Sequence, residues 1–238
     1  MEQVYETLLT LILFMSNTTT QSLSEFVQEW TTQYQQQAQT FKLFTPNSID
    51  WNTHNRAKFA KLFYHIRGHY YQFLWYVGST APSWEYKKIV LDNTTEEFGK
   101  GSKSHDQLYS QFAKDCGVDV IPEILSEEYN LEFIRKFNHN FLELTLKEDW
   151  NKIWGAFSAY EALDNVDYSN LLRLVNDNFE LSASGLVFFK VHASATHYES
   201  TEQLLSAIWD EDPQAVKDGF SWIMKNQLAM WQELGEQF

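Results

Sequence analysis

The sequence predicts an all-α protein, a single-domain helical bundle spanning residues 1–238, and three observations carry this prediction. Along most of the chain, apolar residues recur every three or four positions, which is the spacing of one face of an α-helix. Only 9 glycines and 4 prolines punctuate the 238 residues, whereas an all-β fold needs many turns. No internal repeat, low-complexity tract or linker divides the chain.

Each predicted helix is an amphipathic or apolar stretch that ends at a turn signal. The first has acidic Glu2 and Glu6 where a signal peptide needs positive residues, and it is too short to cross a bilayer. We therefore expect this helix to be buried and the protein to be cytoplasmic. Pro46 and Pro82 mark the breaks on either side of the third helix. In order, helices are predicted at residues 4–15, 22–42, 55–77, 84–97, 105–116, 127–138, 149–163, 168–176, 182–198, 202–210 and 213–233.

The charge of the chain limits its partners. The formal net charge is −14, which repels phosphate backbones and anionic lipid, so we expect neither nucleic acid nor a membrane as partner. Cys116 is the only cysteine, so no intrachain disulfide can form, and we expect a buried, unreactive thiol. His65 and His69 have the spacing of paired zinc ligands but lack the glutamate of His-Glu-x-x-His, which favours a structural role.

His192 is the first histidine whose surroundings point to chemistry. On a continuous helix, His192, Thr196 and Glu199 lie at positions i, i+4 and i+7 and share one face, while His197 points away. Small residues at 193–195 leave room beside the imidazole for an ion, a substrate or dioxygen. A tightly packed core histidine is an equally good interpretation of this segment alone.

Glu161 lies in an otherwise apolar stretch, Ala-Phe-Ser-Ala-Tyr-Glu-Ala-Leu. A buried and unpaired carboxylate costs several kcal/mol, so a partner is required. That partner is a metal ion or a basic side chain, and none of the residues at helical spacing is basic. Asp164, one turn later, either supports the same site or caps the helix.

Glu97 and His105 flank a glycine-containing segment that would let the chain swing the histidine back towards the glutamate. Alone, this pair is an ordinary acidic helix end followed by a loop. Together with Glu161 and His192, it completes a mixed carboxylate and imidazole set, which favours iron or manganese over a structural zinc site.

These pieces, in this order, resemble the haem-oxygenase-like di-iron oxidases. The resemblance runs from about residue 55 to the C-terminus and rests on Glu97-x-Gly, on His105 with the apolar helix after it, and on Glu161 and His192. The family pattern continues from its last helix histidine with an aspartate four residues on and a second histidine three further on. This chain has Thr196 and Glu199 there, so the resemblance implies either a carboxylate ligand at Glu199 or a weakened iron site.

The resemblance implies a non-haem di-iron oxidase that binds two Fe(II) ions and uses dioxygen through a peroxo-di-iron intermediate. It implies the ligands Glu97, His105, Glu161, His192 and Glu199. The expected substrate is amino-acid-like. One reaction known in this family is the oxidative cleavage or rearrangement of a tryptophan-type substrate to a nitrile. Arg67, in apolar surroundings, is the expected partner of a substrate carboxylate, and a homodimer is the expected assembly. The competing hypothesis is a degenerate, non-catalytic helical protein with a binding or regulatory role.

Overall fold

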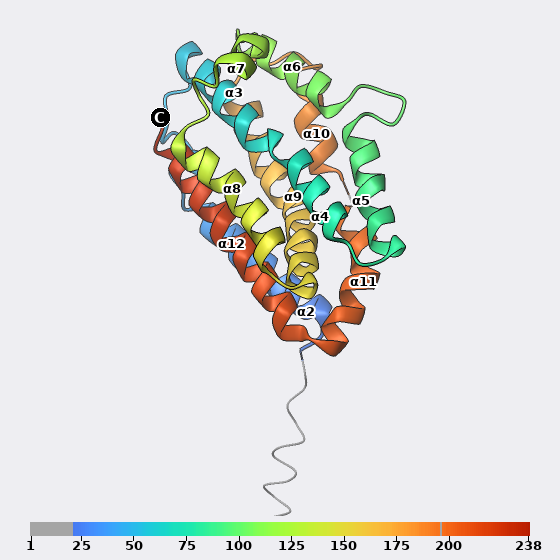
Figure 1. Cartoon of the computed structure of the whole chain (residues 1–238). Coiled ribbons are helices and arrows are strands. Elements are labelled where there is room, and N and C mark those ends of the chain that lie inside the picture. Colours follow the sequence, from blue (N-terminus) through green and yellow to red (C-terminus); the bar gives the residue numbers. More distant parts are fainter. Residues whose placement is uncertain (1–20, 196) are drawn as a thin grey trace, which may run out of the picture.

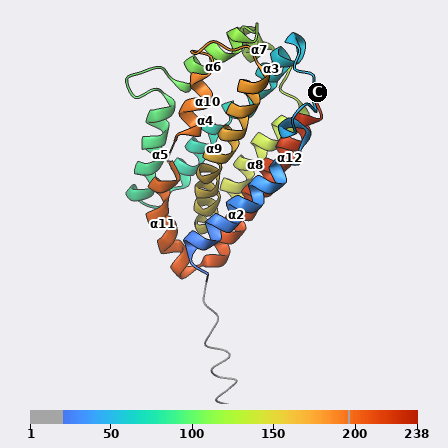
Figure 2. The same ribbon diagram turned by 180° about the vertical axis from the view of Figure 1, so that it is seen from behind.

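The computed structural model describes residues 21–195 and 197–238, and over these residues the predicted all-α fold is confirmed. The predicted helix at residues 4–15 lies outside the described residues. The elements, shown in Figures 1 and 2, are α2 (Leu23–Ala38), a 3-10 turn (Lys42–Phe44), α3 (Thr53–Gly68), α4 (Tyr70–Thr80), α5 (Trp84–Glu97), α6 (His105–Asp115), α7 (Val120–Ser126), α8 (Glu132–Lys147), α9 (Trp150–Asn178), α10 (Val187–Ala193), α11 (His197–Glu211) and α12 (Pro213–Gly235).

The long helix α9 is the centre of the bundle (Figures 1 and 2). On one side it packs along α12, with α2 and α8 beside that pair, and on the other side it packs against α10 and α11. The crossing with α12 is close because both helices have a glycine at the contact. A Cβ atom on Gly219 would lie 2.5 Å from the backbone nitrogen of Ala156, so no larger residue fits this approach.

One aromatic-rich hydrophobic core fills the space between the helices. Phe59, Phe73, Phe112, Phe157 and Phe189 are completely buried in it. Among the described residues, no helix is long and apolar enough to cross a membrane.

Two predictions of where helices begin and end are wrong, because apolar periodicity does not show what the polar side chains at these positions contact. The predicted helix at residues 55–77 is interrupted at His69, whose Nδ1 bonds the carbonyl of Ile66 just after the poor helix former Gly68. Conversely, the predicted helices at 149–163 and 168–176 are one helix, α9. Asp164 and Asp167 lie between the two predicted helices and face the interior.

A third difference moves a functional residue. The predicted helix at residues 182–198 ends at Ala193, and a new helix, α11, begins at His197. The turn is made at Ser194, whose hydroxyl bonds the carbonyls of Lys190 and Val191 and so competes with the helical pattern.

Other differences lie at residues 39–42, where the helix predicted at 22–42 has already ended at Ala38, and before α8, where the sequence predicts no helix at Val120–Ser126 (α7). The segment predicted as a helix from residue 127 starts instead with Glu127 in a left-handed conformation (φ 51°), which ends the short helix α7. Helix α8 begins later, at Glu132, and runs on to Lys147.

Candidate metal centre

Two groups of carboxylates and imidazoles lie where α5, α6, α9, α10 and α11 meet. The first consists of Glu97, His105 and His192, and the second of Glu161, Asp164 and His197. Within each group, one potential ligand atom from every residue lies within 4.8 Å of the others. Both groups touch the C-terminal end of α5, because Glu97 belongs to the first and its neighbour Glu96 bonds His197 of the second.

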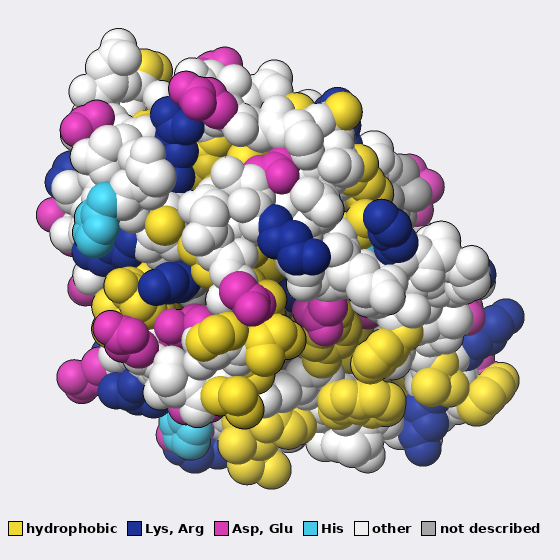
Figure 3. Space-filling model, turned by 90° about the horizontal axis from the view of Figure 1, so that it is seen from above, with side chains coloured by type: hydrophobic (Ala, Val, Ile, Leu, Met, Phe, Trp, Pro, Cys, Tyr) yellow, Lys and Arg dark blue, Asp and Glu magenta, His cyan; other side chains and the backbone are white. Residues whose placement is uncertain are grey.

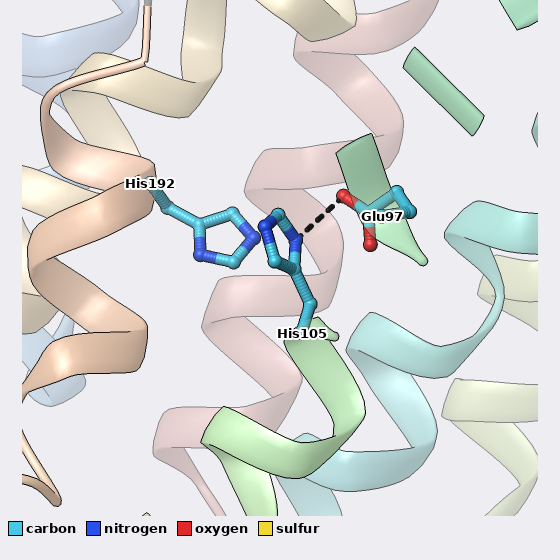
Figure 4. A group of neighbouring side chains, drawn as sticks. All are labelled: Glu97, His105 and His192. Carbon is cyan, nitrogen blue, oxygen red and sulfur yellow. Dashed lines mark hydrogen bonds and ion pairs between the residues drawn. The ribbon is translucent and has the colours of Figure 1, made fainter. Parts of the chain in front are cut away.

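The loop after α5 brings the first two residues together (Figure 4). Gly99 has a φ of +95°, and a Cβ there would lie 2.6 Å from the carbonyl oxygen of Ser102, so only glycine allows this turn. Ser104 then caps α6 with a capping box, which makes His105 the first residue of the helix. As a result, the His105 Nδ1 lies 2.9 Å from Glu97 Oε1, and both side chains are buried.

His192 completes the first group from α10, with its ring facing His105 (Figure 4) at a centroid separation of 4.4 Å. Its Nδ1 donates to the carbonyl of Phe188 at 2.8 Å, which leaves the Nε2 lone pair free. Tyr168 stacks on the ring at 4.2 Å and fixes its plane. Burial, together with the nearby His105, holds the pKa of His192 well below its usual range. The neutral imidazole is the form that binds a metal.

Arg67, the predicted partner of a substrate carboxylate, lies beside the first group and contacts carboxylates of the protein itself. Its Nη1 donates to Asp106 at 2.7 Å, and its Nη2 lies 3.8 Å from Glu97 and 3.3 Å from the hydroxyl of Tyr71. Arg67 is only 5% exposed. In this arrangement it offsets the charge of Glu97, and its fork is already occupied.

In the second group, the two oxygens of Glu161 have different surroundings. Oε1 accepts hydrogen bonds from Tyr70 and from Asn93, the latter at 2.7 Å. Oε2 is buried, and among the described residues it has no hydrogen-bond partner. The Nδ1 of His197 lies 3.3 Å from this oxygen, within ion-pair distance, and among the described residues this buried nitrogen has no hydrogen bond either. Two buried ligand atoms that face each other without a hydrogen bond fit a cation bound to both, which could replace the proton on His197.

The negative charges of the carboxylates around His197 also favour a bound cation. Burial alone would lower the pKa of His197, but the carboxylates of Glu161 and Asp164 outweigh this effect and raise it to about 10. Burial and the charge of Glu161 raise the pKa of Asp164 well above its usual range. Without an ion, a proton on His197 is the positive charge that these carboxylates attract, and a bound metal could take over that role.

The structure brings together Glu97, His105, Glu161 and His192 as two neighbouring groups, and it adds His197 and Asp164. Glu199 belongs to neither group, and its side chain is exposed in the first turn of α11. The expectation that His197 points away is wrong, because the break after Ala193 rotates α11 relative to α10. The sequence signal for this break is the run Ala-Ser-Ala at residues 193–195. These small residues leave room beside His192, but they also allow the chain to leave the helix. Thr196 is outside the described residues.

A surface pocket of about 250 Å³ leads to both groups. His105, His192 and His197 form its inner wall, and Lys100 and Lys103 lie in the loop that borders it. On the inner side, a cavity of about 20 Å³, room for about one water molecule, lies between α3, α8, α9 and α12 and is lined in part by Arg67, Asp164, Asp167 and Tyr168. The sequence alone does not distinguish these lysines, because two lysines in a polar loop are ordinary until the fold places them beside a site.

Most of the chain is similar to a known protein family. Residues 57–222 match a haem-oxygenase-like family described as an iron-containing redox enzyme. None of the curated proteins compared with the chain matches it.

Two crystal structures of a CADD-like protein of unknown function from Nostoc punctiforme PCC 73102, at 1.35 and 2.00 Å resolution, are similar to the chain. The first has a TM-score of 0.68 at 18% identity and covers 89% of this chain and 95% of that one. The second has a TM-score of 0.67, also at 18% identity, and covers 89% and 97%. At this identity the likeness shows the fold.

Proposed function

The chain belongs to the haem-oxygenase-like family of iron-containing redox enzymes, and from that premise we propose that it is a dioxygen-dependent oxidase with two Fe(II) sites. One ion would be held by Glu97, His105 and His192, and the other by Glu161, Asp164 and His197. The observation that carries the proposal is the pair Glu161 Oε2 and His197 Nδ1, two buried ligand atoms that face each other at 3.3 Å and have no hydrogen bond among the described residues.

The type of ligand supports iron. Each group mixes carboxylate and imidazole with no thiolate, a set that suits Fe(II) or Mn(II) and leaves positions open for small molecules. When bound, such ions supply the reduction of dioxygen that an oxidation needs.

The surrounding side chains orient the ligands. Tyr70 and Asn93 hold Glu161 Oε1, so that Oε2 is the atom presented to an ion. The carbonyl of Phe188 fixes the tautomer of His192, and Arg67 offsets the charge of Glu97. The ligands are therefore fixed before an ion arrives, which lowers the cost of assembling the site.

For the substrate, we propose an amino-acid-like molecule that approaches through the 250 Å³ pocket. Lys100 and Lys103 place positive charge at the mouth of a chain whose net charge is −14, which attracts a carboxylate. Leu108 and Val191 provide apolar wall for a side chain. Within this class, the specific case is oxidative cleavage or rearrangement of a tryptophan-type substrate to a nitrile. Because Arg67 is already paired, the lysines fit the role of carboxylate partner better than Arg67 does.

Iron titration tests the proposal. Purified protein titrated anaerobically with Fe(II) should bind two equivalents, and the loaded protein should consume dioxygen. Glu161→Gln removes a charged ligand at nearly constant shape and should bind about one equivalent. Glu202→Gln, at an exposed glutamate on α11, serves as the matched control and should still bind two. A wild-type protein that binds no iron would refute the proposal and favour the non-catalytic alternative.

A further inference from the structure

The outward face of α5 carries a line of large apolar side chains. Trp84, Leu91 and Phe98 follow one another at intervals of seven residues and are 64%, 46% and 59% exposed. Seven residues make about two helical turns, so these side chains lie in one row along the helix. The opposite face of α5, with Asn93 and Glu97, is buried against the candidate metal centre.

Helix α4 widens this row into a patch. Tyr71 on α4 packs against Phe98 with ring centroids 5.4 Å apart, and a Cβ on Gly78 would lie 3.2 Å from Val90. Trp75, between these two positions on α4, therefore lies beside the part of α5 between Val90 and Phe98, and it is 55% exposed. Figure 3 shows apolar side chains gathered along one edge of the molecule, viewed from the end where α6 and α7 lie. Large exposed apolar side chains gathered on neighbouring helices mark a binding surface.

We infer that this patch of α4 and α5 is a homodimer interface, in which α5 of one copy packs antiparallel against α5 of a second copy. Leu91, in the middle of the row, would meet its own counterpart on the twofold axis. Trp84 would then lie against the partner's Phe98. In a twofold interface the same surface is used by both copies, so one end of the row must fit against the other end.

The order of charges along α5 selects a second copy in this orientation. Lys87 and Lys88 lie in the N-terminal half of the helix, and Asp92 and Glu96 in the C-terminal half. Antiparallel pairing about Leu91 brings Lys88 next to the partner's Asp92, whereas parallel pairing would set like charges side by side. Two molecules of net charge −14 repel each other, so they need this local complementarity to associate. The exposed Leu125 on α7 has no such arrangement around it.

Pairing would also affect the candidate site. Phe98 follows Glu97 directly and precedes the loop with Lys100 and Lys103 at the pocket mouth. A partner that covers Phe98 would therefore hold the start of this loop.

Sedimentation or light scattering of the full-length chain tests the interface. The wild-type protein should be a dimer at micromolar concentration, and Leu91→Glu should weaken association at least tenfold. Leu125→Glu makes the same change at a more exposed leucine, 82% exposed, and should leave the dimer intact. Circular dichroism checks that both variants are folded. A monomeric wild type, or a dimer that survives Leu91→Glu, would overturn the inference.

Two further variants test the orientation. Lys88→Asp should dissociate the dimer, and the double variant Lys88→Asp with Asp92→Lys should restore it, since the charges are exchanged in both copies. In a Cys116→Ser background, Trp84→Cys protein mixed with Phe98→Cys protein should form a disulfide-linked dimer. Neither cysteine variant should cross-link with itself. Self-linkage of Trp84→Cys would indicate a parallel pair and contradict the proposed geometry.

Discussion

At the scale of single residues, the carboxylate of Glu161 shows what local sequence can and cannot reveal. Its position in an apolar stretch signals that a buried charge needs a partner. Which partner it has depends on atoms from other helices. Tyr70 and Asn93 bond one oxygen, while the other faces His197. Of these three residues, none is a sequence neighbour of Glu161.

The choice between His197 and Glu199 as iron ligand gives a first prediction. His197→Ala should lower iron binding from two equivalents to about one, because it removes an imidazole that faces Glu161 and Asp164. Glu199→Gln should leave two equivalents, because that side chain is exposed. Anaerobic titration with Fe(II) measures both. The opposite pattern, with iron lost only in Glu199→Gln, would show that Glu199 is the ligand after all.

A second prediction concerns Asp167, which is buried between α2, α9 and α12. It accepts hydrogen bonds from Tyr34 at 2.7 Å and from Gln227 at 3.2 Å. Burial raises the pKa of Asp167 to about 7. Between about pH 4 and 7, the folded protein therefore keeps a proton that the unfolded chain releases, so this group makes the protein less stable as pH rises.

Asp167→Asn removes that titration while keeping an oxygen for Tyr34. The stability of the wild type relative to this variant should fall by about 1.4 kcal/mol per pH unit within the window and level off above it. Urea unfolding of both proteins from pH 5 to 8 measures the difference. A difference that is constant with pH would mean that Asp167 is already ionised in the folded protein at pH 5.

At the scale of elements, the break between α10 and α11 decides the composition of the second ligand group. A continuous helix would have kept His197 on the face away from His192. Because α10 ends at Ala193 and α11 begins anew, His197 instead approaches Glu161 on α9. The segment is short and polar, and its local preference for helix is weak enough for packing against α9 to determine where it turns.

The crossing of α9 and α12 gives a third prediction. Gly219→Ala should destabilise the protein by at least about 1–3 kcal/mol, the usual cost of overpacking, because the added Cβ would lie 2.6 Å from the carbonyl oxygen of Lys152. Gly68→Ala is the control, since a Cβ there meets nothing within 4 Å. It should be neutral or slightly stabilising. Thermal unfolding of both variants compares them, and equal melting temperatures would show that the helices can separate at little cost.

At the scale of the whole molecule, a negatively charged chain concentrates several carboxylates in its interior. Glu97, Glu161 and Asp164 are brought there from two helices, and Arg67 and His197 supply the nearby positive charge. Such a cluster favours the unfolded chain unless a cation is bound. Iron binding and folding stability should therefore be linked.

That linkage gives a fourth prediction. Fe(II) added anaerobically should raise the melting temperature, with a gain of about 2.7 kcal/mol per site at a free concentration a hundred times the Kd. A chelator should reverse the gain. In Glu161→Gln, which is proposed to lose one site, the gain should be about half as large. A melting temperature that does not respond to Fe(II) in the wild type would mean that the ion does not bind the folded protein preferentially.

By itself, the sequence determined the helical class and the identity of four candidate ligands. Helical periodicity is written in the order of residues, and a charged side chain in an apolar stretch is visible without a structure. The return of His105 to Glu97 could also be predicted, because glycines at 99 and 101 and a capping serine are local signals.

Only the tertiary structure decided which side chains lie beside the four candidate ligands. From the sequence, Asp164 is either a ligand or a helix cap, His197 is predicted to point away, and Arg67 is predicted to face a substrate. Each of these roles depends on contacts between residues far apart in the chain, such as His197 with Glu161 and Arg67 with Asp106. Periodicity fixes how residues are spaced on one helix, but the rotation and the ends of a helix are set by what it packs against.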